Sequence, residues 1–370
     1  MHLGSTALKH HKEKHYERDN IQRMTGYTWG EQPGSADVIK LNTNENPYPP
    51  SPEVAKALAG LDLKRLRRYP PPLANDFRDR AASLHGVERD WLIATNGGDE
   101  LLRLLVTTFM EPGTPLATTA PSYSLYPVLA AVQGCATVEV PLGPGFTLPA
   151  DLAERANAAS AALTCVVNPH APTGTLFTVD ELERLATALD GLLLIDEAYV
   201  DFVDPDRGHD AVSLVRRHSN VVLLRTLSKG YALAGLRFGY GIAQPEIIAP
   251  MLEKTRDSYN LDLIAQVLAT AAIDDQTWAK DNAARVRSQR QWLRDGLSEL
   301  GFEVPPSQAN FLFARVPSGH DALTLKTRLQ SAGILLRHFS APGLDDRLRI
   351  SIGSEQENAI LLQRLGELLA

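Results

Sequence analysis

Apolar runs of strand length alternate with helical patterns over most of this chain, from about residue 37 to residue 272. Amphipathic segments such as 100–110 and 179–189 separate several of these runs. This alternation favours a mostly parallel sheet that helices cover on both faces. The expected strands lie at 91–97, 115–120, 136–142, 163–168, 192–196, 221–226 and 236–243. The sequence therefore predicts an α/β domain around a mostly parallel, seven-stranded sheet.

The pattern changes after about residue 274. Residues 278–301 show a long helical pattern that ends at a glycine. Further strands are expected at 310–316, 334–339 and 347–353, and a closing helix at 354–369. We expect a smaller α+β domain here. The predicted parts are a polar arm at 1–24, a large domain at 37–272, and a small domain at 25–36 and 273–370.

The composition is that of an ordinary globular protein, with 44% apolar and 22% charged residues. A formal net charge of −7 argues against non-specific binding to nucleic acid or to an anionic membrane. Cys135 and Cys165 stand in apolar settings without disulfide or metal-ligand spacing, which indicates two buried thiols in a cytoplasmic protein. No apolar run reaches the roughly 18 residues of a membrane helix, and no secretory signal is recognised.

Four histidines stand in the polar arm, at His2, His10, His11 and His15. They share no helical face, and no carboxylate or thiolate pattern accompanies them. A loosely ordered arm explains them better than a metal site, so we expect no metal.

A lysine follows the strand pattern at 221–226. Lys229 stands in RTLSKGYALAGLRFGYG, after Thr226 and Ser228 and eight residues before Arg237. A lysine amine forms a Schiff base with a carbonyl group. Hydroxyls and an arginine fork can hold a phosphate dianion. This combination predicts a site for a phosphorylated aldehyde, a description that pyridoxal phosphate meets.

A carboxylate ends the strand pattern at 192–196. Asp196 closes the apolar run of GLLLIDEAYVDF, and ligands of open α/β sheets lie outside the carboxyl ends of strands. A buried carboxylate needs a cationic partner. A protonated pyridinium nitrogen would serve, and the pairing would keep the ring an electron sink. Tyr199, three residues on, could reach the phenolic oxygen of the same cofactor.

Other segments give weaker signals. Gly98 and Asp99, in TNGGDE, stand between a strand and a helix start, where unpaired N–H groups bind phosphate. Tyr123, in PSYSLYP, could stack on an aromatic cofactor. His170, in the turn VNPHAPTG, is interpreted as a turn residue or a neighbour of the site rather than as a general base.

Two late strand patterns carry arginines beside apolar neighbours. Arg337 and Arg349 would each need an anion if they are buried, which suits an acidic substrate. Arg347 alternates with Arg349 and shares its face. For Arg347 we favour an outward position on an edge strand.

Seven motifs together resemble the histidinol-phosphate aminotransferase family, which consists of fold-type I enzymes dependent on pyridoxal phosphate. The motifs are LNTNENPY, TNGGDELL, PSYSLY, NPHAPTG, IDEAYVDF, RTLSKGYALAGLRFGYG and RLRISIG. They stand in the family's order and at its spacing, and the resemblance covers nearly the whole chain. One such motif would be a weak signal, whereas seven in order are a strong one.

The resemblance implies a role for each matching residue. Lys229 would hold the cofactor and shuttle a proton, Asp196 would pair with the ring nitrogen, and Tyr199 would bond the phenolic oxygen. Tyr123 would stack on the ring. The implied phosphate contacts are Gly98, Asp99, Thr226, Ser228 and Arg237, with Tyr69 reaching the cofactor of a neighbouring subunit in a homodimer. The implied substrate contacts are Tyr27, Asn44, Arg337 and Arg349.

One position departs from the usual pattern of fold-type I aminotransferases. Their turn reads Asn-Pro-Thr-Gly, and that asparagine bonds the phenolic oxygen of the cofactor. Here the position is Ala171, which cannot donate such a bond. Asn168 or His170 could take its place.

The resemblance implies amino transfer between histidinol phosphate, or a related amine or aromatic amino acid, and a 2-oxo acid such as 2-oxoglutarate, by a ping-pong mechanism. Decarboxylation of a phosphorylated amino acid, as in the threonine-phosphate decarboxylase relatives, stays open because a fold does not settle the reaction type. A non-catalytic regulator that binds pyridoxal phosphate is a third reading, but no DNA-reading domain or basic stretch supports it.

Overall fold

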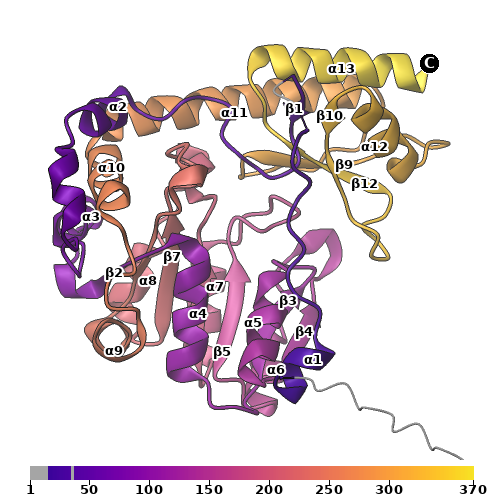
Figure 1. Ribbon diagram of the computed structural model, residues 1–370. Helices are drawn as coiled ribbons and strands as arrows, with labels where there is room; N and C mark the ends of the chain where they lie inside the picture. Colours follow the sequence, from indigo (N-terminus) through magenta and orange to yellow (C-terminus); the bar gives the residue numbers. More distant parts are fainter. Residues whose placement is uncertain (1–15, 35–36) are drawn as a thin grey trace, which may run out of the picture.

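The computed structural model describes residues 16–34 and 37–370, so the four histidines of the polar arm lie outside the described residues. A large α/β part and a smaller C-terminal part make up the molecule (Figure 1). The smaller part lies toward the end of the large sheet to which the parallel strands point (Figure 1). This arrangement places the carboxyl ends of those strands between the two parts.

Seven strands form the large sheet in the order β2-β8-β7-β6-β5-β3-β4. They are β2 (Leu92–Thr95), β3 (Leu116–Ala120), β4 (Thr137–Pro141), β5 (Leu163–Val167), β6 (Leu192–Asp196), β7 (Val221–Thr226) and β8 (Gly239–Ile242). Strand β8 runs antiparallel to both neighbours. The other adjacent pairs are parallel. The prediction of a mostly parallel seven-stranded sheet is confirmed.

Helices cover both faces of this sheet because successive side chains of a strand point to opposite faces. On β6, Leu193 and Ile195 join one apolar core, and Leu194 joins the other. The first core includes α2 (Pro52–Ala59), α3 (Asn75–His85), α6 (Leu152–Ala158), α7 (Val179–Ala188), α8 (Val212–Arg217) and α10 (Leu263–Asp274). The second includes α4 (Gly97–Phe109), α5 (Leu125–Gln133) and α9 (Pro245–Pro250). Packing on both faces holds the strand ends in fixed positions.

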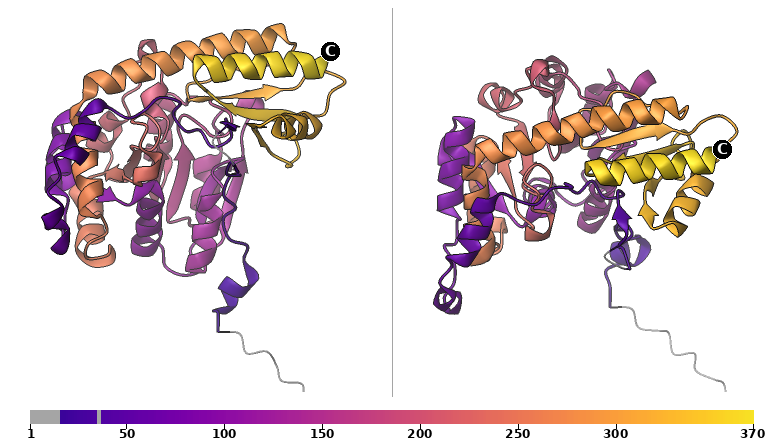
Figure 2. Two further views of the ribbon diagram at one scale, coloured as in Figure 1. Left: turned by 45° about the horizontal axis from the view of Figure 1, so that its top comes forward. Right: turned by 90° about the horizontal axis from the view of Figure 1, so that it is seen from above.

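The C-terminal part has its own sheet and core. Its three antiparallel strands follow the order β11-β12-β9. They are β9 (Phe311–Arg315), β11 (Arg337–His338) and β12 (Arg347–Ser351). The helices are α11 (Gln276–Glu299), α12 (Ala322–Ser331) and α13 (Glu355–Leu369). Helix α11 runs beside α13 and reaches back over the large part, so it spans both parts (Figure 2).

The run predicted as one strand at 334–339 forms two strands instead. Residues Ile334–Leu335 (β10) pair in parallel with Ile39–Lys40 (β1), whereas β11 pairs with β12. A continuous strand is therefore the wrong prediction here, because apolar alternation does not reveal that a chain changes its pairing partner. Strand β8 is also shorter than the predicted 236–243, since a 3₁₀ turn occupies Ala234–Leu236.

The N-terminal segment connects the two parts. Helix α1 (Asp19–Arg23) contacts α5. The chain then runs past the large sheet to β1 (Figure 1). After β1 it crosses back to α2 (Figure 1). The predicted domain bounds stay a prediction. The pairing of β1 with β10 favours placing residues 39–41 with the small domain.

Candidate active site

A cavity of about 390 Å³ opens at the carboxyl ends of β5, β6 and β7 and faces the small part. Thirteen of the residues singled out from the sequence line it: Tyr27, Asn44, Gly98, Asp99, Tyr123, Asp196, Tyr199, Thr226, Ser228, Lys229, Arg237, Arg337 and Arg349. Asn168 and Tyr69 are not among the lining residues. Residues from distant parts of the chain thus converge on one space.

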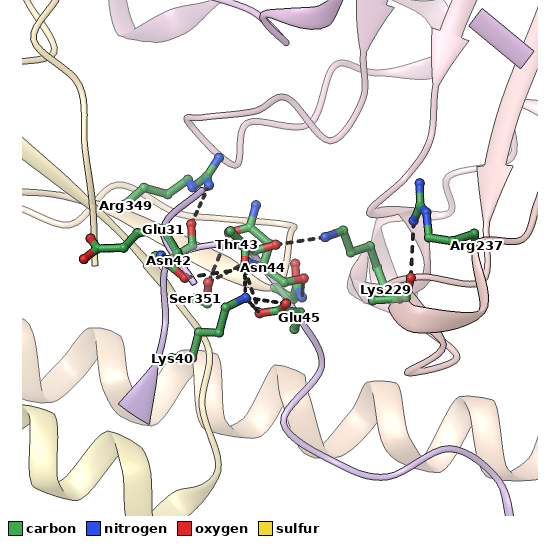
Figure 3. Close-up of polar contacts among 12 residues, drawn as sticks. Glu31, Lys40, Asn42, Thr43, Asn44, Glu45, Lys229, Arg237, Arg349 and Ser351 are labelled. Atoms are coloured by element: carbon green, nitrogen blue, oxygen red, sulfur yellow. Dashed lines mark hydrogen bonds and ion pairs between the residues drawn. The ribbon is translucent and has the colours of Figure 1, made fainter. Parts of the chain in front are cut away.

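Lys229 extends across this cavity toward the N-terminal segment (Figure 3). Its Nζ atom donates a hydrogen bond to the carbonyl oxygen of Thr43 at 2.9 Å. Burial lowers the pKa of the Lys229 amine to about 8, and the nearby carboxylate of Glu45 opposes that shift. A substantial fraction of this amine is therefore neutral, and able to act as a nucleophile, near pH 7 to 8.

Asp196 lies at the end of β6, on the cavity wall. The hydroxyl of Tyr126 donates to its Oδ2 at 2.8 Å, and the backbone N–H of Ala198 donates to its Oδ1 at 3.1 Å. Burial raises the pKa of Asp196 to about 6, although both hydrogen bonds act in the opposite direction. Tyr126 was not identified from the sequence as a residue of the site. PSYSLYP contains two tyrosines, of which only Tyr123 was singled out.

A corner of hydroxyl, guanidinium and helix N–H donors lies beside Lys229. Thr226 Oγ1 donates to Ser228 Oγ at 3.0 Å, and Arg237 Nη1 reaches that oxygen at 3.5 Å. Helix α4 begins at Gly97, and the first N–H groups of a helix have no partner within it. Glycine suits position 97, because its φ of +71° is one that residues with a side chain rarely adopt. This corner suits a phosphate group.

Two tyrosines form an aromatic wall of the cavity. The rings of Tyr27 and Tyr123 meet edge to face with centroids 5.9 Å apart. The hydroxyl of Tyr123 donates to Asp99 Oδ1 at 3.3 Å. Asp99 also pairs with Arg237 at 3.4 Å. Asp99 therefore links Tyr123 to the corner of donors that suits a phosphate group, which we call the phosphate-type corner.

The segment 39–46, which we call the strap, contributes four lining residues, Asn42 to Glu45. It is fastened to the small part, because Leu41 N–H donates to Leu335 O of β10 at 2.9 Å and Ser351 N–H of β12 donates to Leu41 O at 2.9 Å. Within the strap, Lys40 pairs with Glu45 (Figure 3). The Asn46 amide donates to the carbonyl oxygen of Lys229 at 3.0 Å. Of this segment, only Asn44 was predicted from the sequence to belong to the site.

Two arginines approach the cavity from the small sheet. Arg337 and Arg349 are direct partners in the pairing of β11 with β12. Arg349 Nη2 donates to the carbonyl oxygen of Asn42 at 2.9 Å, while its Nε is buried without a partner among the described residues. Both guanidinium groups lie 5.5 Å from the ring of Phe339. Their positive charge and the free donor favour an anionic group at this end.

The outward position favoured for Arg347 is wrong. Arg347 is 5% exposed, and its guanidinium lies 5.5 Å from the rings of both Phe146 and Phe313. It does share a face with Arg349, as predicted, but β12 is the central strand of its sheet. Arg347 does not line the cavity.

The two residues considered as substitutes for the usual asparagine are engaged elsewhere. The Asn168 amide donates to Phe177 O at 3.2 Å and accepts from Phe177 N–H at 2.7 Å. The ring nitrogens of His170 lie 2.9 Å from Thr173 Oγ1 and 3.0 Å from Pro121 O. Burial lowers the pKa of His170 to about 4, so its ring is neutral. Contact of either residue with a cofactor stays a prediction.

Tyr69 lies on the surface rather than in this cavity. It is 79% exposed, and its ring stacks on Tyr259 with centroids 4.4 Å apart. Leu63 and Leu66, in the preceding turn, are 69% and 49% exposed. These exposed apolar side chains lie close together in the chain, between α2 and α3.

Residues 16–34 and 37–370 contain neither a cluster of metal ligands nor a membrane-spanning helix. No group of three or more potential ligands is placed there to hold a metal ion. No helix in this part of the chain combines the length and apolar character that crossing a bilayer requires. Both cysteines are buried and free.

Comparisons with known proteins agree on one family. The model of "Aminotransferase class I and II" matches residues 36–365. Histidinol-phosphate aminotransferase 1 of Trichormus variabilis is 43% identical over 96% of this chain and 99% of its own length. Histidinol-phosphate aminotransferase of Geobacter sulfurreducens is 42% identical over 95% of this chain and 99% of its own length. The structure of histidinol-phosphate aminotransferase from Sinorhizobium meliloti in complex with pyridoxal-5'-phosphate superposes with a TM-score of 0.89 at 26% identity, covering 97% of this chain and 98% of that one.

Proposed function

This chain belongs to the class I and II aminotransferase family, and on that premise we propose that it is a pyridoxal-phosphate-dependent aminotransferase acting on histidinol phosphate and 2-oxoglutarate. The observation that carries the proposal is the placement of Lys229 and Asp196 on one cavity beside a phosphate-type corner. Relatives over nearly the full length carry the histidinol-phosphate aminotransferase name. This activity would place the protein in histidine biosynthesis.

The residues of the cavity fit this cofactor. The carboxylate of Asp196 is buried and forms no ion pair with a described protein residue, so a cationic ring nitrogen would supply the charge it lacks. The Lys229 amine would hold the aldehyde carbon, and Thr226, Ser228 and Arg237 would hold the phosphate. When bound, pyridoxal phosphate supplies a ring that withdraws electrons from the carbon bearing the substrate nitrogen.

The chain's own groups would move the proton and hold the charges. The Lys229 amine, with its pKa lowered to about 8, can accept a proton at Nζ near neutral pH and return it. Tyr126 and Ala198 hold the Asp196 carboxylate in one orientation. A cation facing Asp196 would lower the pKa of this carboxyl, because an opposite charge favours its ionised form.

Arg337 and Arg349 would bind the acidic group of each substrate. A phosphate and a carboxylate both match the planar donor fork of arginine. Both amino donor and 2-oxo acid could therefore use the same end of the cavity in turn, as a ping-pong exchange requires. The wall formed by Tyr27 and Tyr123 offers apolar contact for a substrate ring.

We also propose a cytoplasmic homodimer. The exposed side chains of Leu63, Leu66 and Tyr69 support it, because large apolar side chains exposed along one short segment favour burial against a partner. In such a dimer Tyr69 would reach the neighbouring subunit's cofactor phosphate. Sedimentation equilibrium of the intact protein tests this. A monomer at micromolar concentration would contradict it.

A donor panel tests the activity itself. The purified protein with pyridoxal phosphate and 2-oxoglutarate should form glutamate fastest with histidinol phosphate, and more slowly with aromatic amino acids. Glutamate would be measured in a coupled assay, and carbon dioxide release in parallel. Carbon dioxide release from a phosphorylated amino acid, without glutamate, would replace the proposal by the decarboxylase alternative.

A further inference from the structure

The hydroxyl of Tyr199 accepts a hydrogen bond from the side-chain amide of Asn44. Asn44 Nδ2 lies 3.1 Å from Tyr199 Oη. Both residues line the cavity, and the Tyr199 ring is packed edge to face against Phe311 at 5.1 Å. In the part of the chain that the structure describes, no protein acceptor takes the proton of this hydroxyl. That proton is therefore available to a group inside the cavity.

Asn44 is held firmly by residues of the small part. Its backbone N–H donates to Ser351 Oγ at 2.8 Å, and its carbonyl oxygen accepts from Asn310 Nδ2 at 2.9 Å. Its φ of 57° lies in the left-handed region, which asparagine adopts more readily than most residues. The residue is 1% exposed. The side chain therefore has little freedom to turn away from Tyr199.

The direction of the bond between Asn44 and Tyr199 follows from the hydroxyl of Ser351. This hydroxyl accepts the backbone N–H of Asn44, so its own proton needs another acceptor. Asn44 Oδ1 lies 3.2 Å away and accepts it. A flipped amide would leave the buried proton of Ser351 without a partner among the described residues. The amide nitrogen therefore faces Tyr199, and the tyrosine is left as a donor toward the cavity.

In the usual pattern of fold-type I aminotransferases, an asparagine supplies a second donor to the phenolic oxygen of the cofactor. Here Ala171 stands at that position and presents only a methyl group to the cavity. The amide of Asn168 is engaged by Phe177. Both ring nitrogens of His170 are engaged by Thr173 and Pro121. This side of the cavity thus depends on the hydroxyl that Asn44 orients.

We infer that Asn44 is a positioning residue that compensates for Ala171: by donating to Tyr199, it keeps that hydroxyl a donor to the phenolic oxygen of the cofactor. The inference rests on the proposed function and goes beyond it. A hydrogen bond donated to an ionised oxygen favours the ionised form. Asn44 therefore lowers the pH at which the visible band of the lysine-bound cofactor titrates. It does so only through Tyr199, whose hydroxyl it orients.

The first test is a spectroscopic pH titration of the loaded protein. Asn44→Ala should raise the midpoint of the visible band by up to about one pH unit, because it frees the Tyr199 hydroxyl to turn away, and one hydrogen bond from that hydroxyl to a charged oxygen is worth about this much. Ser351→Ala, which releases the amide without removing it, should shift the midpoint in the same direction by less. Asn220→Ala is the matched control. It removes an asparagine amide that donates to the carbonyl oxygens of Ala186 and Gly191, outside the cavity lining, and should leave the midpoint unchanged.

A double-mutant cycle asks whether Asn44 acts through Tyr199. In a Tyr199→Phe background, Asn44→Ala should cause no further shift of the midpoint. A second variant, Ala171→Asn, should restore the midpoint when it is combined with Asn44→Ala. An equal shift with and without the tyrosine hydroxyl, or a failure of Ala171→Asn to restore the midpoint, would overturn the inference.

The outcomes separate this inference from the proposed function. An unchanged midpoint in Asn44→Ala, with a normal visible band, would overturn the positioning role and leave the aminotransferase proposal intact. A wild-type protein that shows no visible band with pyridoxal phosphate would overturn both. The melting temperatures of the cofactor-free variants report folding independently of activity.

Discussion

The ε-amino group of Lys229 donates a hydrogen bond at 2.9 Å to the backbone carbonyl of Thr43, which lies 186 positions earlier in the chain. The bond joins the loop after β7 to the strap, and through the strap to the small sheet (Figure 3). Any residue at position 43 would offer the same carbonyl, so no side-chain pattern could have indicated this contact. This hydrogen bond holds the Lys229 amine near the carboxylate of Glu45, whose charge raises the pKa of the amine.

The rate of cofactor capture should depend on pH through this amine. Burial lowers the pKa of Lys229 to about 8, and only the neutral amine attacks an aldehyde. Capture of pyridoxal phosphate by the cofactor-free protein should therefore speed up as pH rises and level off above about pH 8. Stopped-flow absorbance would measure the rate.

Removing the Glu45 charge should move this profile to lower pH, because that carboxylate raises the pKa of Lys229. Glu45→Gln is the variant. Glu53→Gln, which removes an exposed carboxylate paired with Lys56, is the control and should leave the profile unchanged. A profile unaffected by Glu45→Gln would show that the two groups do not interact in solution.

Lys229 should be required both for the visible absorbance of the loaded protein and for turnover. Lys229→Ala should lose the visible band and reduce kcat by at least about 10³-fold, since it removes both the covalent anchor and the proton carrier. Lys254→Ala changes an exposed lysine and should behave as wild type. Absorbance spectra and glutamate formation would be compared. A variant at position 229 that kept both would refute the assignment of this lysine.

Arg347 and Arg349 should differ in function although they lie two residues apart on one strand. Arg349 lines the cavity, so Arg349→Lys should lower kcat/KM about 10- to 100-fold by removing the planar donor fork. Arg347 instead packs between Phe146 and Phe313. Arg347→Lys should lower the melting temperature and change KM by less than about twofold. Steady-state kinetics and thermal melts measure both effects. Equal losses of kcat/KM would contradict the distinction.

The arginine pair also shows where prediction from sequence reaches its limit. Alternation correctly placed both side chains on one face of β12. It could not show that β12 has neighbours on both edges, which is why the outward position for Arg347 was wrong. Lys229 and Asp196 were found because each follows an apolar strand, and the carboxyl ends of parallel strands lie at one edge of the sheet.

The partners of these groups could not be found in the same way. Tyr126 lies 70 positions from Asp196, and Asn44 lies 155 positions from Tyr199. Such contacts depend on how helices and the strap pack across the sheet, and a pattern within one segment does not encode them. The fold was thus predictable from local periodicity, whereas the hydrogen-bond network that orients the site required the tertiary structure.

Asp196 should make the cofactor-free protein less stable as pH rises through the weakly acidic range. Its pKa is raised from 3.8 to about 6, mainly by burial. A carboxyl group with a higher pKa in the folded state binds more protons there than in the unfolded chain. Between about pH 4 and pH 6 its ionisation therefore reduces the free energy of unfolding. The shift corresponds to roughly 3 kcal/mol at most.

Asp196→Asn removes this dependence, so the cofactor-free variant should gain stability relative to wild type as pH rises from about 4 to 6, and the difference should then level off. The pKa of Asp201 is also raised to about 6 by burial, but this group is present in both proteins and cancels in the difference. Pyridoxal phosphate should reverse the order at pH 7, because a cationic ring nitrogen would stabilise the carboxylate and not the amide. Urea unfolding at several pH values, with and without the cofactor, measures both effects. A difference that does not change with pH would mean that Asp196 titrates normally, and a cofactor that stabilises both proteins equally would remove Asp196 as the partner of the ring.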